Sequence, residues 1–172
     1  EAIKTVYNGV LRDSANQFYD SKFDIAKLSN IKNDAIKSIL SAKLLEAQNK
    51  GISISVEIEE PVSNFRIELL DFITILSVLC DNAIEATIEA ISPRMTVAFM
   101  NNDDSLVLII ENSIKSEKVD VNHIFAKGYS SKGEGRGLGL HNVNSVLEKY
   151  PKSTITTRSA NHLFSQTIRF CK

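Results

Sequence analysis

The sequence is poor in the features that mark several common classes of protein. Its two cysteines, Cys80 and Cys171, have no metal-like spacing and no further cysteine beside them, which argues against zinc and favours the reduced state of a cytosolic protein. The formal net charge of -1 contains no basic excess, so nucleic acid is not expected as the main partner. The longest apolar run, 72–80, is far shorter than the about 20 residues of a membrane span. No signal peptide is visible.

What remains is the composition of a globular protein. The chain has 172 residues, of which 43% are hydrophobic, and this length suits one domain or one domain with an appendage. No internal repeat or low-complexity segment is present. The chain opens on Glu1 and not on methionine, which suggests a fragment of a longer protein.

The spacing of apolar residues predicts a series of helices and strands. Helices are expected over 1–22, 33–50, 65–90 and 138–149, and strands over 52–59, 95–100, 106–110, 155–158 and 164–170. The polar stretch 20–32 is interpreted as a linker with a short turn of helix, and 113–136 as a long irregular segment of the kind that carries function. This order predicts an α/β fold, a two-layer sandwich in which helices cover one face of a mixed five-stranded sheet, preceded by an amino-terminal helix. We expect two parts, 1–32 and 33–172.

Glycine is concentrated in one place. Four of the chain's seven glycines fall within seven residues: Gly133, Gly135, Gly137 and Gly139. Glycine is costly in regular structure, so the cluster needs a reason in backbone geometry or in close approach of a ligand. One reason is a phosphate-binding loop with the positive end of the 138–149 helix behind it. The other is a flexible linker or lid, although the alternating Leu138 and Leu140 favour a packed structure.

Spacing excludes two better-known glycine loops. A Walker-type loop needs lysine after its second glycine, but Gly128 and Gly133 are followed by Glu134. The dinucleotide fingerprint fails because the positions for its last glycine hold Leu138, Leu140 and Asn142.

A polar group interrupts the long apolar helix predicted over 65–90. Asn82 and Glu85 are one turn apart and lie on one face of that helix. An ordinary solvated stripe would account for them, but asparagine is a poor residue for a helix interior. Its amide oxygen is a good ligand for Mg²⁺, which binds through one or two protein oxygens together with nucleotide phosphates.

Together the two motifs carry a family resemblance. Segment 79–86, Leu-Cys-Asp-Asn-Ala-Ile-Glu-Ala, resembles the N box of the GHKL ATPases, the family of gyrase B, Hsp90, MutL and the histidine kinases. Segment 135–140, Gly-Arg-Gly-Leu-Gly-Leu, resembles their second glycine box. With 124–125 and 129–133 in the lid, the chain from about Ser38 onward is similar to peptide-pheromone sensor histidine kinases of the accessory-gene-regulator and competence type. The resemblance implies the Bergerat (GHKL) fold and a catalytic domain that uses ATP and Mg²⁺.

The resemblance also implies roles for individual residues. Asn82 is expected to hold Mg²⁺, and Asn82 and Lys132 to act in catalysis. The residues implied in nucleotide binding are Asn82, Glu85, Asn112, Lys132, Gly133, Gly135, Arg136, Gly137, Leu138, Gly139 and Leu140. Backbone amides of the glycines would hold the phosphates, while Lys132 and Arg136 would add positive charge. As ordinary residues of an exposed loop, these two would instead serve solubility.

One departure from the family concerns the adenine. Most members carry D-x-G-x-G after the middle strand, and its aspartate binds the adenine amino group, whereas this chain has Glu111-Asn112-Ser113. Strand alternation places Asn112 in the row of Ile110 and Glu111 on the opposite face. Asn112 and Glu111 both stay candidates for the adenine contact, since an amide oxygen also accepts an N–H. The missing carboxylate predicts weak binding of ATP.

A second departure concerns hydrolysis. Hydrolytic members place a glutamate one turn before the metal asparagine, where this chain has Val78, which cannot take a proton. This favours phosphoryl transfer to another nucleophile. In a histidine kinase that nucleophile is a histidine of a dimerisation hairpin, but the chain's histidines are only His123, His141 and His162. We therefore expect 1–22 to correspond to the second helix of that hairpin, with the histidine helix absent.

The partners follow from the same resemblance. They are ATP, the protein's own dimerisation and phosphoacceptor domain in a homodimer, and the receiver domain of a response regulator. The domain would be cytoplasmic, within a protein tethered to the cell membrane, and would serve quorum sensing. The alternatives are a nucleotide-binding adaptor or anti-sigma module and a hydrolytic chaperone or repair ATPase, the latter disfavoured by Val78.

Overall fold

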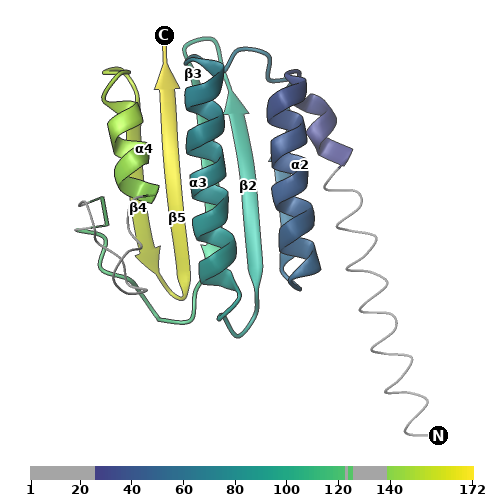
Figure 1. Ribbon diagram of the computed structural model, residues 1–172, viewed down its shortest axis with the longest axis vertical. Coiled ribbons are helices and arrows are strands. Elements are labelled where there is room, and N and C mark those ends of the chain that lie inside the picture. The colour runs from purple at the N-terminus through teal and green to yellow at the C-terminus, as the bar shows by residue number, and fades with distance from the viewer. Residues whose placement is uncertain (1–25, 123, 126–138) are drawn as a thin grey trace, which may run out of the picture.

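The structure is a computed structural model that describes residues 26–122, 124–125 and 139–172 (Figure 1). The helix predicted over 1–22 and most of the glycine-rich loop lie outside the described residues. The described chain is built on one sheet, whose strands are β1 (Ser53–Ile58), β2 (Arg94–Asn101), β3 (Ser105–Ser113), β4 (Thr154–Ala160) and β5 (Leu163–Cys171). Their order across the sheet is β1-β2-β3-β5-β4. β1 and β2 pair in parallel and the other neighbours are antiparallel, so the sheet is mixed.

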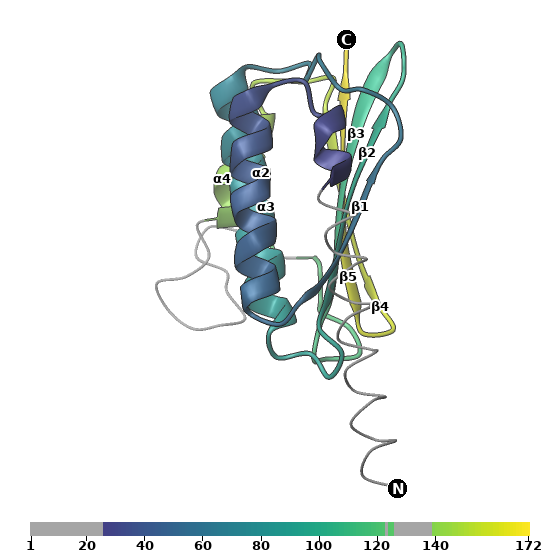
Figure 2. The same ribbon diagram turned by 90° about the vertical axis from the view of Figure 1, so that its right-hand side faces the viewer.

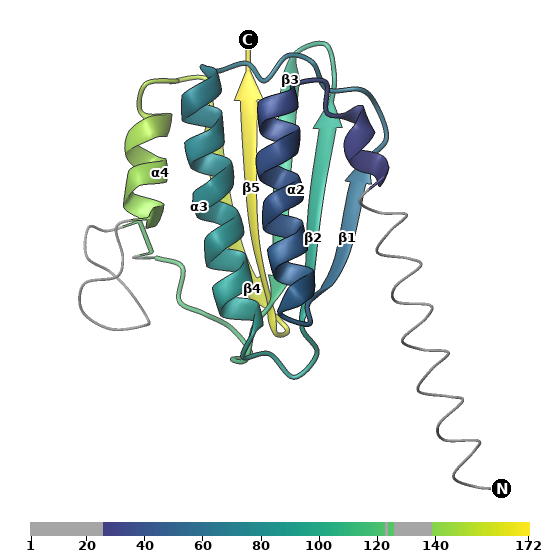
Figure 3. The ribbon, with the colours of Figure 1, turned by 45° about the vertical axis from the view of Figure 1, so that its right-hand side comes forward.

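The helices lie on one face of this sheet. They are α2 (Asp34–Asn49), α3 (Leu69–Thr87) and α4 (Gly139–Leu147), and a short 3-10 turn, η1 (Lys27–Asn30), precedes them. Figure 2 shows the helices in one layer and the strands in the other, and Figure 3 shows α2, α3 and α4 side by side. We call the covered face of the sheet its inner face and the opposite face its outer face. The predicted two-layer α/β fold is confirmed.

Alternation of side chains explains which residues of the sheet reach the core. In β1 the inner residues Ile54, Val56 and Ile58 are buried, as the strict alternation of 52–59 predicts. The β4–β5 hairpin turns at Asn161 and His162, whose φ angles of 52° and 60° are those of a two-residue hairpin turn that matches the twist of its strands.

The beginning and end of α2 follow from local chemistry. The side chain of Asn33 accepts hydrogen bonds from the backbone N–H groups of Ala35 and Ile36, which have no partner inside the helix. After the helix, Gly51 has a φ of 79°, a conformation that favours glycine. Both ends lie close to the predicted limits of 33 and 50.

The start of α3 and the end of β3 differ from the prediction for tertiary reasons. α3 begins at Leu69 and not at 65, because Arg66 has a φ of 67° and Glu68, with a ψ of 140°, is not helical. Leu69, its first residue, is 39% exposed. β3 continues to Ser113 and not only to 110, because both neighbouring strands pair with its last residues.

Aromatic residues fill the centre of the sandwich. Phe72 of α3 is fully buried, and its ring centroid lies 4.7 Å from that of Phe65, 6.3 Å from that of Phe99 and 5.4 Å from that of Phe170. These contacts join the first turn of α3 to β2 and β5. The inner face near this end of α3 is therefore packed with apolar side chains and has no room for a polar ligand.

Candidate functional site

The first element of the site is the carboxyl-terminal half of α3. It carries Asn82, which is partly buried, and Glu85, which is exposed. Neighbouring Asp81 forms an ion pair with Lys43 of α2 at 2.5 Å, and this hydrogen bond is the main cause that raises the pKa of Lys43. The ion pair joins α2 to the segment that carries Asn82.

The second element is the amino terminus of α4, which approaches α3 closely. A Cβ atom added to Gly139 would lie 3.1 Å from Cγ1 of Val78 and 3.8 Å from both terminal atoms of the Asn82 side chain. The last glycine of the glycine-rich segment therefore lies beside Val78 and Asn82, the residue proposed to hold the metal. A side chain at position 139 would crowd Val78, which would have to shift by a few tenths of an ångström. Leu140 is partly buried and packs against the core.

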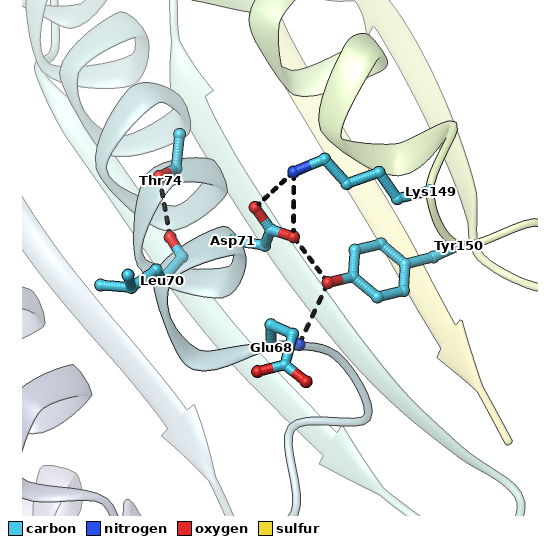
Figure 4. A network of polar contacts seen from close by, with 6 residues as sticks. All are labelled: Glu68, Leu70, Asp71, Thr74, Lys149 and Tyr150. Atoms are coloured by element: carbon cyan, nitrogen blue, oxygen red, sulfur yellow. Dashed lines mark hydrogen bonds and ion pairs between the residues drawn. The ribbon is translucent and has the colours of Figure 1, made fainter.

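A polar network holds the far end of α4 (Figure 4). The Tyr150 hydroxyl donates to Asp71 Oδ2 at 2.6 Å and accepts from the backbone N–H of Glu68 at 3.2 Å. Lys149 adds an ion pair to Asp71 at 3.1 Å. The hydrogen bond from Tyr150 holds the pKa of Asp71 below its usual value, and partial burial together with Asp71 raises the pKa of Tyr150. Because α3 and α4 run in opposite directions, the network ties the start of α3 to the end of α4 while Asn82 meets Gly139 at the other end.

The third element is the inner face of the sheet. Asn112, at the end of β3, is 2% exposed, and its Nδ2 donates to the carbonyl oxygen of Ser113 at 3.0 Å. Glu111 points to the outer face, where it lines a groove of about 490 Å³ with residues of β4 and β5 that include Arg158. Of the two candidates for the adenine contact, only Asn112 therefore faces the helices.

Sequence reasoning missed two residues of this face, Gln166 on β5 and Thr157 on β4. Gln166 is 2% exposed, and its Nε2, like Oγ1 of Thr157, is buried without a hydrogen-bond partner among the described residues. A signal was present in the sequence, since Gln166 interrupts the apolar row that contains Phe164, Ile168 and Phe170.

The remaining predicted residues lie outside the described part of the chain. They are Lys132, Gly133, Gly135, Arg136, Gly137 and Leu138. Among the described residues, no group of three or more His, Cys, Asp or Glu side chains could hold a metal ion. No helix in this part of the chain combines the length and hydropathy needed to cross a membrane.

Cys80, next to Asp81, takes no part in the site. Its thiol is fully buried, and burial raises its pKa to about 12. The thiol therefore stays protonated at neutral pH and acts as a small apolar residue of the core.

The described residues fit a nucleotide with its metal ion. The side chain of Asn82 supplies one hard oxygen beside the helix terminus at Gly139, where backbone N–H groups point outward. Mg²⁺ needs only one or two protein oxygens when phosphates supply others. On the sheet, the buried amides of Asn112 and Gln166 match the polar edge of a base.

Comparison with known proteins identifies the family. The profile of the GHKL domain family matches residues 67–171, more than half of the chain, and the chain belongs to this family. The match contains both segments whose contact has been described, the Asn82 segment and the Gly139 segment.

Two curated relatives are named as sensor proteins. Sensor protein CitS of Bacillus subtilis (strain 168) is 32% identical over 127 residues, covering 70% of this chain and 23% of CitS. Sensor histidine kinase DcuS of Escherichia coli (strain K12) is 30% identical over 144 residues, covering 81% of this chain and 26% of DcuS. The chain therefore spans about a quarter of the length of these relatives.

Solved structures share the fold. The catalytic domain of histidine kinase ThkA, in a nucleotide-free form, superimposes with a TM-score of 0.68 at 18% identity, covering 82% of this chain and 92% of that domain. The mycobacterial sensor histidine kinase MprB gives a TM-score of 0.61 at 17% identity, covering 78% of this chain and 92% of that structure. At this identity the likeness concerns the architecture alone.

Proposed function

We propose that this chain is the ATP-binding catalytic domain of a two-component sensor histidine kinase. The observation that carries the proposal is the position of Gly139 beside Asn82. It places a helix amino terminus, which can bind phosphate, next to an amide oxygen, which can bind Mg²⁺. In this reaction a nitrogen of an acceptor histidine attacks the γ-phosphorus of ATP. The bond from that phosphorus to the β–γ bridging oxygen breaks, ADP leaves, and the imidazole loses its proton to solvent.

The surroundings of Asn82 support transfer and not hydrolysis. Val78 lies one turn before Asn82, and its Cγ1 is in contact with Gly139. An aliphatic side chain cannot accept a proton from water, and none of the described residues at this contact is a carboxylate. Phosphoryl transfer then depends on positioning a stronger nucleophile in line with the γ-phosphate.

The whole protein's setting belongs to the same proposal. Its partners are a dimerisation and phosphoacceptor domain in a homodimer and the receiver domain of a response regulator. The relatives named as a sensor protein and a sensor histidine kinase support them. The catalytic domain is cytoplasmic in a membrane-tethered protein. We propose a peptide pheromone as the signal on the strength of the motif resemblance. Phosphorylation of the regulator should then respond to a peptide from the culture medium, and a response only to a small metabolite would overturn this finer assignment.

Binding is the first test of the catalytic proposal. Titration calorimetry with Mg²⁺ and ATP should give a dissociation constant weaker than about 1 μM, near -8 kcal/mol, because the adenine carboxylate is missing. Tighter binding would show that neutral residues of the site fully replace the missing adenine carboxylate. Absence of any binding would contradict the proposed function.

Incubation with γ-labelled ATP tests the reaction. The chain alone should release little phosphate and should not label itself, whereas a longer version of the protein with a histidine-bearing dimerisation helix should gain acid-labile label. Acid-labile label on His123, His141 or His162 would overturn our assignment of the acceptor. Rapid release of phosphate would favour a hydrolytic ATPase, and binding without transfer in the longer protein would favour an adaptor.

A further inference from the structure

One row of the inner face changes its character from one side of the sheet to the other. The row runs through register partners on all five strands: Val56, Val97, Ile110, Gln166 and Thr157. Its first three members are apolar and at most 2% exposed. Its last two members, Gln166 and Thr157, carry a buried amide nitrogen and a buried hydroxyl group that have no hydrogen-bond partner among the described residues.

Buried polar atoms without a hydrogen-bond partner lower the stability of the nucleotide-free protein. A buried donor without a hydrogen bond has lost its water and gained nothing in return. A methionine or leucine at position 166 would continue the apolar row at no such cost. The amide of Gln166 therefore points to a ligand that supplies the missing acceptor.

Asn112 lies next to this amide on the same face. Asn112 is the register partner of Phe164, two residues from Gln166, so Asn112 and Gln166 are diagonal neighbours on adjacent strands. Such residues are about 7 to 8 Å apart and within reach of a shared partner. The Asn112 nitrogen already donates to Ser113, which leaves its oxygen as the acceptor.

The Asn112 oxygen as an acceptor and the Gln166 amide as a donor are together complementary to adenine and not to guanine. Adenine presents its amino group as a donor between two ring nitrogens, N1 and N7, that accept. Guanine presents an oxygen where adenine has the amino group, so the Asn112 oxygen would face another acceptor. The pair of amides can thus select a base without a carboxylate.

We propose that Gln166 is a specificity-determining residue for ATP, an inference that rests on the proposed function. The Asn112 oxygen accepts from the adenine amino group, and Nε2 of Gln166 donates to the ring nitrogen beside it. The pair replaces, with two neutral hydrogen bonds, the aspartate that most of the family uses.

The test compares two glutamines whose amide nitrogens are both buried without a partner among the described residues. Gln166→Met removes the amide on β5, and Gln48→Met removes the one on α2, away from Asn112. Dissociation constants for Mg²⁺ with ATP and with GTP are measured by titration calorimetry, and thermal transitions are recorded without nucleotide. Gln166→Met should weaken ATP binding about tenfold, equal to about 1.4 kcal/mol, and leave GTP unchanged. Gln48→Met should leave both constants unchanged, and neither variant should lower the thermal transition.

Modified bases identify the atom involved. The unchanged protein should bind either 1-deaza-ATP or 7-deaza-ATP about tenfold more weakly than ATP, because one of them lacks the accepting nitrogen. Gln166→Met should bind that analogue and ATP equally. The affinities of the unchanged protein for ATP and the two analogues can be measured without any variant. They therefore test the proposal even if Gln166→Met fails to fold.

The outcomes separate the two proposals. Failure of the unchanged protein to bind any nucleotide would overturn the proposed function itself. If it binds ATP while Gln166→Met keeps the same affinity and the same ratio of ATP to GTP, only the role of Gln166 is overturned. Equal affinity of the unchanged protein for ATP and both deaza analogues would have the same meaning.

Discussion

The two flanks of the helical layer are held to the sheet in different ways. On one flank, α2 buries four apolar side chains that are 0% exposed: Ile36, Leu40, Leu44 and Ala47. On the other flank, α4 buries only Val143 and Leu147, and polar contacts from Lys149 and Tyr150 to α3 hold its end. Burial of apolar area is strong and non-directional, whereas hydrogen bonds contribute less and depend on geometry.

The difference between the two flanks suggests that stability and ligand binding depend on different parts of the molecule. The inner face beside α2 is apolar throughout, while the inner face of β5 and β4 carries Gln166 and Thr157. A flank that must admit a polar ligand cannot also be sealed by apolar side chains. We infer that the α2 flank supplies most of the stability and that the α4 flank supplies the site.

The largest expected effect is on the stable flank. Leu40→Ala should lower the free energy of unfolding by about 2 to 5 kcal/mol, because it leaves a cavity in a fully packed core. Chemical denaturation measures this change. Leu45→Ala is the matched control, since Leu45 lies on the same helix but is 49% exposed, and it should change stability by less than about 0.5 kcal/mol. A change of similar size in both variants would contradict the comparison.

The next effect concerns binding. Asn82→Ala should weaken the Mg²⁺-dependent binding of ATP about 100-fold, because Asn82 is the protein ligand that we propose for the metal, while the thermal transition of the free domain stays nearly the same. Titration calorimetry with Mg²⁺ and with EDTA measures the metal-dependent part. Asn49→Ala, at an exposed position near the end of α2, is the control and should bind normally. A large loss of stability without loss of binding would make Asn82 an ordinary residue of the helix packing.

A smaller effect is expected from the polar network at the end of α4. Tyr150→Phe removes the hydrogen bonds to Asp71 and from Glu68, and should lower the free energy of unfolding by about 1 to 2 kcal/mol. Lys149→Met removes an ion pair in which the lysine side chain itself is 60% exposed, and should cost less, about 0 to 1 kcal/mol. Denaturation by urea would compare the two. A larger loss from Lys149→Met would show that charge, and not the tyrosine hydroxyl, holds this end of the helix.

The smallest effect is the acid dependence of the same network. Because the folded-state pKa of Asp71 is lowered, its ionisation stabilises the fold above the carboxyl's unfolded pKa of about 3.9, and this contribution is lost as the pH falls through the folded pKa. The stability difference between the unchanged protein and Asp71→Asn should therefore be larger at neutral pH than at about pH 2.5. Urea denaturation at the two pH values measures it. A difference that grows in acid would reverse the sign of our assignment.

Local patterns in the sequence were enough to predict the elements and their layers. Alternation placed β1 and the inward side of Asn112, and the cap at Asn33 placed the start of α2. The boundaries of α3 and β3 were less accurate because a strained residue at Arg66 and the pairing of β3 with both neighbours depend on contacts far away in the chain.

The sequence by itself determined which residue types are available: a mid-helix asparagine, a glycine-rich segment, and no D-x-G-x-G motif after the middle strand. Only the tertiary structure decided which of them meet. Gly139 reaches Asn82 because α4 packs antiparallel to α3, and Gln166 is buried beside Asn112 because β5 inserts between β3 and β4. Periodicity reports one element at a time, whereas the positions of these residues relative to one another depend on packing between elements that are distant in the chain.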